Sequence, residues 1–157
     1  MIAADARFAV QDLLADAVNM LDRDALEEWV ECFAEDAVYR ILSRENTERG
    51  LPLPLLQCEN KNMIRDRVLS LRKANVTNPH RDRHVAGPAK LSIASDQVIV
   101  AESAYALYQS TLEGATRLFS VGSYRDLIRV HSGSAQFLER TVTVDMFSVP
   151  TMLSTPI

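Results

Sequence analysis

The fold is decided by residues 59–88, which read ENKNMIRDRVLSLRKANVTNPHRDRHVAGP. The first half of this stretch places Ile64, Val68 and Leu71 at positions i, i+4 and i+7, and Met63 widens the apolar stripe. This spacing predicts a helix with one buried face. Beyond residue 88, polar and apolar residues mostly alternate, which is typical of strands. The stretch therefore predicts a helix that packs across a sheet built from the C-terminal half of the chain.

Both ends of this helix carry signals in the sequence. Asn60 or Asn62 can accept hydrogen bonds from the free N–H groups of the first turn. Arg72 and Lys73 suit the negative end of the helix dipole in the last turn. Residues 75–79, NVTNP, then end the helix, because a residue before proline avoids the helical conformation.

Two further helices and a short strand are expected before this stretch. The helices span residues 6–21 and Asp22–Phe33, and each repeats apolar residues at helical spacing. In the second helix, Asp24 followed by Glu27 three residues later resembles a capping box. The strand spans Ala37–Leu42, where β-branched and aromatic residues gather.

Residues 43–58 contain one glycine and two prolines, so we expect an ordered excursion without regular structure there. Four leucines make this excursion too apolar for a free linker, and they should cover the core or meet another chain: Leu51, Leu53, Leu55 and Leu56. The tail, residues 148–157, reads SVPTMLSTPI and is also apolar and uncharged. It is expected to dock on its own sheet or on a neighbouring subunit.

The second half of the chain predicts four strands joined by connections of hairpin length. Neighbouring strands should therefore run antiparallel. Gly122 lies inside the third strand and is a candidate bend or bulge point. The predicted strands are Lys90–Ala94, Gln97–Gln109, Arg117–Val130 and Ala135–Phe147.

Length and charge exclude several classes of protein. A chain of 157 residues fits one domain, spanning residues 1–157. A net charge of −4 argues against a nucleic-acid or anionic-membrane partner. No apolar run approaches the roughly 18 residues of a membrane span, and the N-terminal sequence lacks a signal-peptide pattern. We therefore expect a cytoplasmic protein in which Cys32 and Cys58 are reduced.

Two histidines four residues apart, His80 and His84, raise the question of a metal site. Pro79 and the Gly87–Pro88 break make a helix unfavourable there. In an extended segment the two rings would stand roughly 13 Å apart, too far to share one ion. We therefore expect no metal site, and interpret residues 81–83, Arg-Asp-Arg, as an ion-pairing cluster within the fold or across a subunit interface.

If the chain is an enzyme, its active site must lie in the cup between the helices and a coiled sheet. An aspartate or histidine in an apolar cup could have a shifted pKa and transfer protons. The sequence contains no G-x-S-x-G, P-loop, G-x-G-x-x-G or H-E-x-x-H motif. The candidates expected to face the cup are Asp22, Trp29, Tyr39, His84, Tyr124 and Asp145.

Several segments together resemble one protein family. Residues 24–53, DALEEWVECFAEDAVYRILSRENTERGLPL, contain a tryptophan-bearing helix, Phe-x-x-Asp, a tyrosine-bearing strand and Arg-Glu-Asn-x-x-Arg-Gly. Residues 63–75 and 81–88 supply a matching helix and an Arg-x-Arg-His segment, and ERTVTVD at 139–145 also fits, as does the terminal Pro-Ile. Over nearly its whole length the chain resembles the small (beta) subunits of aromatic-ring-hydroxylating dioxygenases, in particular the salicylate, anthranilate and terephthalate type.

The resemblance implies a fold and a division of labour. The fold would be α+β, a cystatin-like cone with N-terminal helices packed on a long, curved antiparallel sheet. This chain would carry no cofactor. A large (alpha) subunit would hold a Rieske [2Fe–2S] cluster and a mononuclear Fe(II), and a reductase would deliver electrons from NADH or NADPH. The small subunit would form a trimer within an α3β3 hexamer.

Our leading expectation is therefore a non-catalytic structural subunit. The residues expected to make subunit contacts are Arg44, Glu45, Asn46, Arg49, Arg81, Arg83, His84, Met152, Leu153 and Ile157. The alternative is a stand-alone cone-fold dehydratase or isomerase acting on a small apolar substrate through Asp22, Tyr39 and His84. A third hypothesis is a module on the same scaffold that binds a small ligand.

Overall fold

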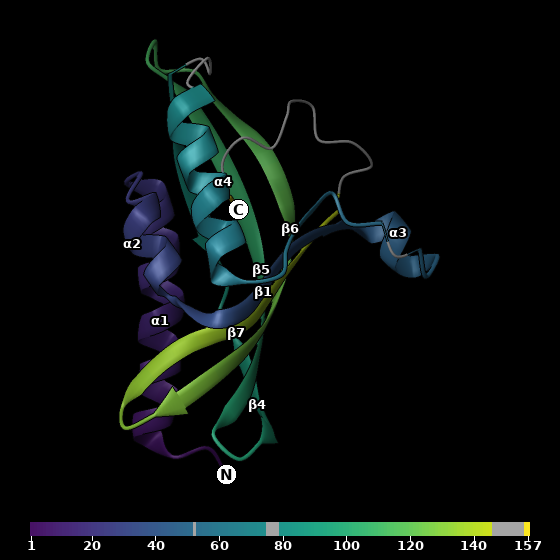
Figure 1. Cartoon of the computed structure of the whole chain (residues 1–157). Helices are drawn as coiled ribbons and strands as arrows, with labels where there is room; N and C mark the ends of the chain where they lie inside the picture. The colour runs from purple at the N-terminus through teal and green to yellow at the C-terminus, as the bar shows by residue number, and fades with distance from the viewer. Residues whose placement is uncertain (52, 75–78, 146–155) are drawn as a thin grey trace.

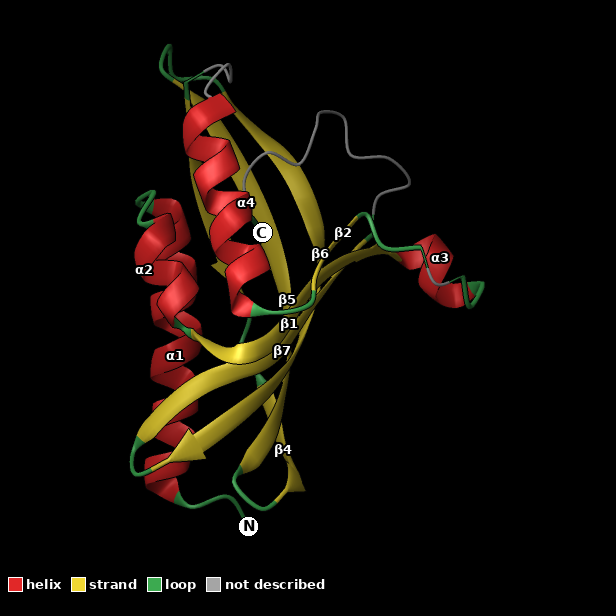
Figure 2. Cartoon of the chain, viewed as in Figure 1, coloured by secondary structure: helices red, strands yellow, loops and turns green. Residues whose placement is uncertain are grey.

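The structure is a computed structural model that describes residues 1–51, 53–74, 79–145 and 156–157. Three helices, α1 (Ala4–Asp22), α2 (Leu26–Glu31) and α4 (Lys61–Ala74), lie together on one side of a strongly curved sheet (Figure 1). A fourth, short helix, α3 (Arg44–Glu48), projects away from the body of the molecule (Figure 2). This arrangement is the expected α+β cone, with N-terminal helices on a curved sheet.

The sheet formed by the described residues has seven strands in the order β2-β1-β7-β6-β5-β3, and β4 also pairs with β5. The predicted strands after residue 88 are confirmed within a few residues as β4 to β7, although residues 146 and 147 lie outside the described residues. The strands are β1 (Phe33–Ser43), β2 (Leu56–Cys58), β3 (His80–Ala86), β4 (Lys90–Ser95), β5 (Val98–Thr111), β6 (Thr116–His131) and β7 (Ser134–Val144).

The sheet is mixed, which corrects the expectation of a purely antiparallel one. β1 pairs with β7 in parallel, joining residues that are about a hundred positions apart, such as Tyr39 and Arg140. The charged segment that begins at His80 is itself a strand, β3, antiparallel to one half of β5. β4 pairs with the other half of β5, so both short strands fit along the same edge of one long strand.

The second helix is shorter than predicted, and Asp24 does not cap it. Asp24 has φ of 61°, and Ala25 occupies the N-cap position without a side-chain hydrogen bond. The backbone N–H of Ala25 donates to Met20 O at 2.8 Å, which is the bond that closes a Schellman turn at the end of α1. Because this turn requires a left-handed residue, Asp24 ends the first helix instead of starting the second.

Residues 43–58 are more regular than expected. The Ser43 hydroxyl accepts a hydrogen bond from Asn46 N at 3.2 Å, which caps α3. Three residues of β2 then pair antiparallel with β1. Leu51, Leu53 and Leu55 remain exposed, and Leu56 is partly buried against the core.

The central helix α4 packs as its spacing predicted. Ile64 and Val68 are 1% and 4% exposed, whereas Met63 is 40% exposed and does not extend the buried face. The Asn60 side chain caps the helix by accepting from Met63 N at 3.0 Å. The residues predicted to end the helix, 75–78, lie outside the described residues.

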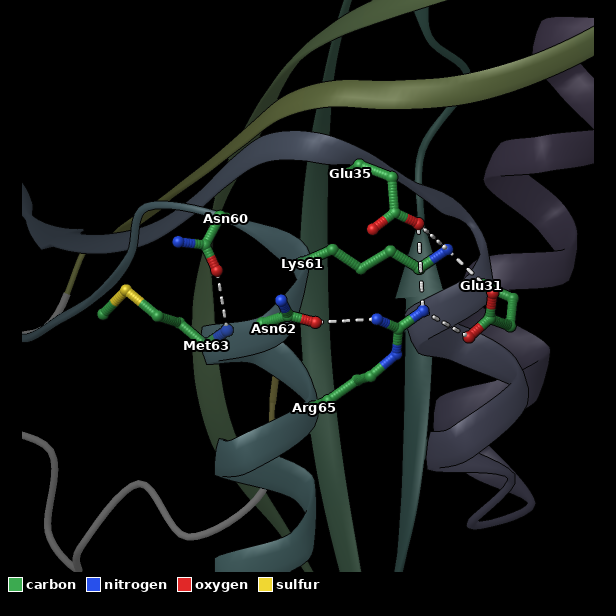
Figure 3. A network of polar contacts seen from close by, with 7 residues as sticks. All are labelled: Glu31, Glu35, Asn60, Lys61, Asn62, Met63 and Arg65. Atoms are coloured by element: carbon green, nitrogen blue, oxygen red, sulfur yellow. Dashed lines mark hydrogen bonds and ion pairs between the residues drawn. The ribbon is translucent and has the colours of Figure 1, made fainter.

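A charged network fastens the start of α4 to its neighbours (Figure 3). The nearly buried Lys61 ammonium lies 2.7 Å from Glu31 Oε2 and 3.6 Å from Glu35 Oε1. Arg65 approaches the same two carboxylates at 3.3 and 3.9 Å. Near the other end of α4, Arg72 donates to both Glu27 carboxylate oxygens at 2.9 Å. Charged contacts therefore join α2 to both ends of α4.

The core contains an aromatic cluster where α2 meets β1. Trp29 packs edge-on against Phe33 and Tyr39, with ring centroids 4.8 and 5.3 Å apart. The end of the chain closes this cluster. Ile157 is 1% exposed, its N–H donates to the Tyr39 hydroxyl at 3.0 Å, and that hydroxyl donates to Ile157 O at 3.1 Å. The predicted docking of the tail is confirmed for its last residue, while residues 148–155 lie outside the described residues.

Gly122 does not form the predicted bulge. The irregularity between β5 and β6 falls at Phe119, since Tyr108 pairs with Leu118 and Leu107 pairs with Ser120. Gly122 stays in register, and its missing side chain lets β7 pass close by. Within the described residues, no helix is long and apolar enough to cross a membrane.

Candidate functional site

A pocket of about 490 Å³ lies between α1 and the sheet, and we call it the cone pocket. α1 supplies a wall of apolar side chains with two amides, Gln11 and Asn19, and the segment from β3 to β4 forms the facing wall. β6 and β7 supply two large polar side chains. The residues used below to define the cone pocket are Leu14, Val18, His84, Ala89, Tyr124 and Arg140.

His84 and Asp22 form a buried pair at the edge of the cone pocket. Asp22 is the last residue of α1, and His84 is in the middle of β3. The His84 backbone N–H reaches Asp22 Oδ1 and Oδ2 at 3.0 and 3.1 Å, and its ring Nδ1 lies 2.6 Å from Oδ1. Because a carboxylate can only accept, Nδ1 donates and the ring orientation is fixed.

The fixed ring leaves its second nitrogen without a partner. His84 Nε2 is buried and has no hydrogen bond among the described residues. The Asp22 carboxylate accepts from His84 and lies 3.5 Å from Arg83 Nη1. It therefore faces these two residues and not the interior of the pocket. The arrangement therefore presents Nε2, not the carboxylate, as the free polar group.

Tyr124 and Arg140 form a second polar group in the pocket wall. The Arg140 guanidinium lies 4.1 Å from the Tyr124 ring centroid, and its Nε lies 3.2 Å from Asp126 Oδ1. Burial raises the pKa of the Tyr124 hydroxyl well above its usual range, so the hydroxyl keeps its proton. Burial also raises the pKa of Asp126 to about 6, against the opposing effect of Arg140.

The structure brings together only part of the predicted catalytic set. His84 and Tyr124 line the pocket, with Asp22 behind His84. Trp29 and Tyr39 belong to the aromatic core, where burial raises the pKa of Tyr39 and its hydroxyl is bonded to Ile157. Asp145 lies apart from the pocket, paired with Arg44 at 2.9 Å. The alternative trio of Asp22, Tyr39 and His84 is therefore not assembled around one cavity.

Arg140 and Asp126 escaped prediction from the sequence. They are opposite each other in neighbouring strands, and each is 1% exposed. The signal was present in the alternation of residues. Asp126 shares its parity with buried Tyr124, and Arg140 shares its parity with buried Val142, so two charges occupy inward positions.

The residues predicted to make subunit contacts divide into exposed and buried ones. Arg44, Arg49, Arg81 and Arg83 are exposed, and Glu45 and Asn46 are half-buried. His84 and Ile157 are buried within the chain itself, and Met152 and Leu153 lie outside the described residues. In the predicted ion-pairing cluster, Asp82 pairs with His80 at 3.3 Å, and Arg83 approaches Asp22.

The projecting segment, residues 44–51 and 53–55, which we call the arm, is held together by contacts between its own residues. Arg49 pairs with Glu45 at 2.8 Å, and the Asn46 side chain donates to Leu53 O at 3.1 Å. Its leucine side chains face solvent instead, and Leu53 is 64% exposed. The arm therefore offers an apolar surface on an internally braced segment.

The side chains that the structure describes do not fit an iron site. Among the described residues, no three His, Cys, Asp or Glu side chains are placed to hold a metal ion. Cys32 and Cys58 are free thiols, and burial raises the pKa of both, which disfavours the thiolate that metals bind. The residues thus do not suit an iron–sulfur cluster or a mononuclear iron.

Comparison with known proteins defines the class first. A solved beta subunit assigned to an aromatic-ring-hydroxylating dioxygenase of Novosphingobium aromaticivorans DSM 12444 superposes with a TM-score of 0.88 at 36% identity, covering 97% of both chains. The cone is thus that of a dioxygenase beta subunit.

The sequence comparisons then establish the family. The family model described as ring hydroxylating beta subunit matches residues 16–150. The chain is 36% identical over 140 residues to the anthranilate 1,2-dioxygenase small subunit of Burkholderia cepacia, covering 89% of this chain and 87% of the relative. It is 27% identical to the beta 1 subunit of the terephthalate 1,2-dioxygenase terminal oxygenase component of a Comamonas species, covering 87% and 89%. The chain belongs to the family of ring hydroxylating beta subunits.

Proposed function

We propose that this chain supports a catalytic large subunit that hydroxylates an aromatic acid of the anthranilate or benzoate type. The observation that carries the proposal is the match along nearly the whole chain to the small subunit of an anthranilate 1,2-dioxygenase. The described residues also offer no ligand set for iron, while the arm offers an unpartnered apolar surface. The chain then contributes shape and contact surface, and works in the cytoplasm in the catabolism of the aromatic compound.

The redox groups belong to the partner in this proposal. The large subunit holds the Rieske [2Fe–2S] cluster and the mononuclear Fe(II), and a reductase supplies electrons from NADH or NADPH. Three copies of each subunit assemble as an α3β3 hexamer, with the small subunits forming a trimer. The dioxygenase family of the relatives supports this arrangement.

The arm is the proposed contact surface for another subunit. Exposed leucines on a braced segment gain from burial, at about 25 cal/mol per Å² of apolar surface removed from water. The charged residues proposed to flank or extend this contact are Arg44, Glu45, Asn46, Arg49, Arg81 and Arg83. Met152 and Leu153 of the tail are proposed as further contacts.

Native mass spectrometry of the chain co-expressed with its large subunit tests the assembly. We expect a hexamer with three copies of each chain. Leu53→Asp should weaken assembly, because it places a charge in the apolar contact. Leu112→Asp is the matched control, since Leu112 is 66% exposed but lies in the β5–β6 turn, outside the arm. A chain that stays monomeric beside the large subunit would contradict the proposal, as would equal losses from both variants.

A further inference from the structure

The face of the sheet that points away from the helices carries exposed apolar side chains from three neighbouring strands. Val85 of β3, Tyr108 of β5 and Leu118 of β6, which we call the outer patch, are 56%, 38% and 53% exposed. Tyr108 pairs with Leu118 on one side and with Arg83 on the other, and Arg83 shares its face of β3 with Val85, so the three side chains adjoin. The helices α1, α2 and α4 lie on the other side of the sheet and leave the outer patch uncovered (Figure 1).

Two arginines border the outer patch on β3. Arg81 and Arg83 are two and four residues before Val85, so all three side chains point to the same face. Both arginines are exposed, and Arg81 forms no ion pair with a described residue. Arg83 lies 3.5 Å from Asp22 at the end of α1, with its side chain still largely exposed. The outer patch therefore fits a partner that combines an apolar side chain with carboxylates.

The exposed side of α1 has this composition. Phe8, Asp12 and Asp16 follow one another at intervals of four residues and form a line along the helix, which we call the α1 stripe. Phe8 is 63% exposed, and aromatic side chains are enriched in interfaces. Both aspartates are exposed, and neither forms an ion pair with a described residue. Because like charges four residues apart repel, positive charges from outside the chain would stabilise this helix.

The charge of the whole chain is divided in the same way. Residues 1–36, which contain α1 and α2, carry ten acidic and two basic residues and a formal net charge of −8. Residues 37–157 carry eleven acidic and fifteen basic residues and a net charge of +4. Each copy of the chain thus brings one surface of each sign, which favours a head-to-tail contact between copies.

We propose that the α1 stripe of one small subunit docks on the outer patch of the next. Phe8 contacts the apolar side chains of the outer patch, and Asp12 and Asp16 lie beside Arg81 and Arg83. The sheet is then covered on both faces, as in other layered folds. Because the two surfaces differ, the contact is heterologous and closes a ring around a threefold axis. The inference rests on the proposed trimer and states which surfaces form it.

Cross-linking between two cysteine variants tests this contact. Asp12→Cys chains and Arg81→Cys chains are mixed, assembled with the large subunit and treated with a short bismaleimide. We expect a covalent dimer of small subunits from the mixture and none from either variant alone. The unmodified chain controls for Cys32 and Cys58. Asp96→Cys in place of Arg81→Cys is the matched control and should give no dimer, since Asp96 is exposed in the β4–β5 turn, outside both surfaces.

A charge placed in the outer patch should weaken the trimer of small subunits. Leu118→Asp should raise the concentration at which half of the trimers dissociate by at least about tenfold, because the contact loses an apolar side chain and must bury a charge. Ile93→Asp is the matched control and should have little effect. Ile93 is as exposed as Val85, but it pairs with buried Ile99 and so belongs to the other face of the sheet. Native mass spectrometry of the complex over a dilution series measures the dissociation.

A charge exchange within one chain separates docking from folding. Asp12→Arg should weaken the trimer about tenfold without lowering the unfolding midpoint, because it also removes the repulsion from Asp16. Adding Arg81→Asp to the same chain should recover most of this loss, since every contact in the ring then receives the exchanged charges. A role for Asp12 in folding alone predicts the opposite, a lower midpoint and no recovery.

The outcomes distinguish this inference from the proposed assembly. A small-subunit trimer that gives no dimer from the mixed cysteine variants, or that resists both Leu118→Asp and Asp12→Arg, would overturn the inference and leave the assembly standing. An intact trimer that loses the large subunit in these variants would assign the surfaces to the large subunit and also overturn it. Complexes without any small-subunit trimer would overturn the proposed assembly and the inference together.

Discussion

At the scale of single residues, Gly122 shows how closely β6 and β7 approach. A Cβ at this position would collide with the backbone oxygen of Thr143 and lie 2.9 Å from a ring carbon of Tyr105. The backbone cannot move without disturbing the register on both sides. We expect Gly122→Ala to lower the free energy of unfolding by roughly 3 kcal/mol, as overpacking does in a tight core.

Urea unfolding measures this change, and Gly87→Ala provides the comparison. The nearest atom to a Cβ at Gly87 is the backbone oxygen of Ala104 at 3.6 Å, an ordinary contact. The Gly87 variant should therefore stay within about 1 kcal/mol of the unmodified chain. Similar stabilities for both variants would contradict the close approach at Gly122.

The raised pKa of buried Asp126 should make the stability of the chain depend on pH. Burial raises its pKa in the folded chain from 3.8 to about 6, despite the nearby Arg140. The folded chain then binds a proton that the unfolded chain releases between these values, so this residue favours folding at low pH. Its contribution is lost as the pH rises through about 6, by up to roughly 3 kcal/mol.

Asp126→Asn isolates this contribution, because asparagine does not titrate. The unfolding free energy of the variant minus that of the unmodified chain should increase between pH 4 and pH 7. Taking the difference cancels the titration of other groups. A constant difference, or one that decreases with rising pH, would show that burial does not raise the pKa of Asp126.

Some residues of the site could be predicted and others could not. His84 and Tyr124 followed from their position near the expected cup. Tyr39 was expected to face the same cup, but its strand turns it toward the core, where Ile157 occupies its hydroxyl. That contact joins residues 118 positions apart, and no local pattern reveals it.

At the scale of elements, the last residue of the chain packs into the core. Ile157 is 1% exposed and both its backbone groups bond to the Tyr39 hydroxyl. Ile157→Ala should lower the free energy of unfolding by roughly 2–4 kcal/mol, through lost burial and the cavity left behind. Tyr39→Phe should cost roughly 1–3 kcal/mol, because two buried backbone groups lose their partner.

Chemical unfolding of both variants measures how much this contact contributes to stability, with Leu112→Ala as the control. Leu112 is 66% exposed, so its truncation should change stability by less than about 0.5 kcal/mol. An effect of Ile157→Ala no larger than this control would mean that the end of the chain does not contribute to the core.

Elements whose signals are local were predictable from the sequence. The buried spacing of Ile64 and Val68 and the cap at Asn60 determine α4, and hairpin connections determine β4 to β7. The predicted start of α2 was wrong because a left-handed turn at Asp24 competes with the capping box. The parallel pairing of β1 with β7 was missed because it depends on packing across the whole chain.

At the scale of the whole molecule, the fold separates two surfaces. The cone pocket lies between α1 and the sheet. The arm, by contrast, projects away from the body of the molecule (Figure 1). Changes at one surface should therefore leave the other intact, and the effects of Leu53→Asp in the arm and of Tyr124→Phe in the pocket wall on the free energy of unfolding should add. Distant sites with no shared contacts usually behave additively.

The central claim is that this chain supplies surface while redox metals belong to its partner. Its most direct test compares the iron content and the oxygen-dependent hydroxylation of an aromatic acid for the isolated chain and for the chain assembled with its large subunit, with the reductase and NADH or NADPH supplied to both. We predict that the isolated chain neither retains stoichiometric iron nor hydroxylates the acid, and that the assembled complex does both. Stoichiometric iron and turnover by the isolated 157-residue chain would contradict the account.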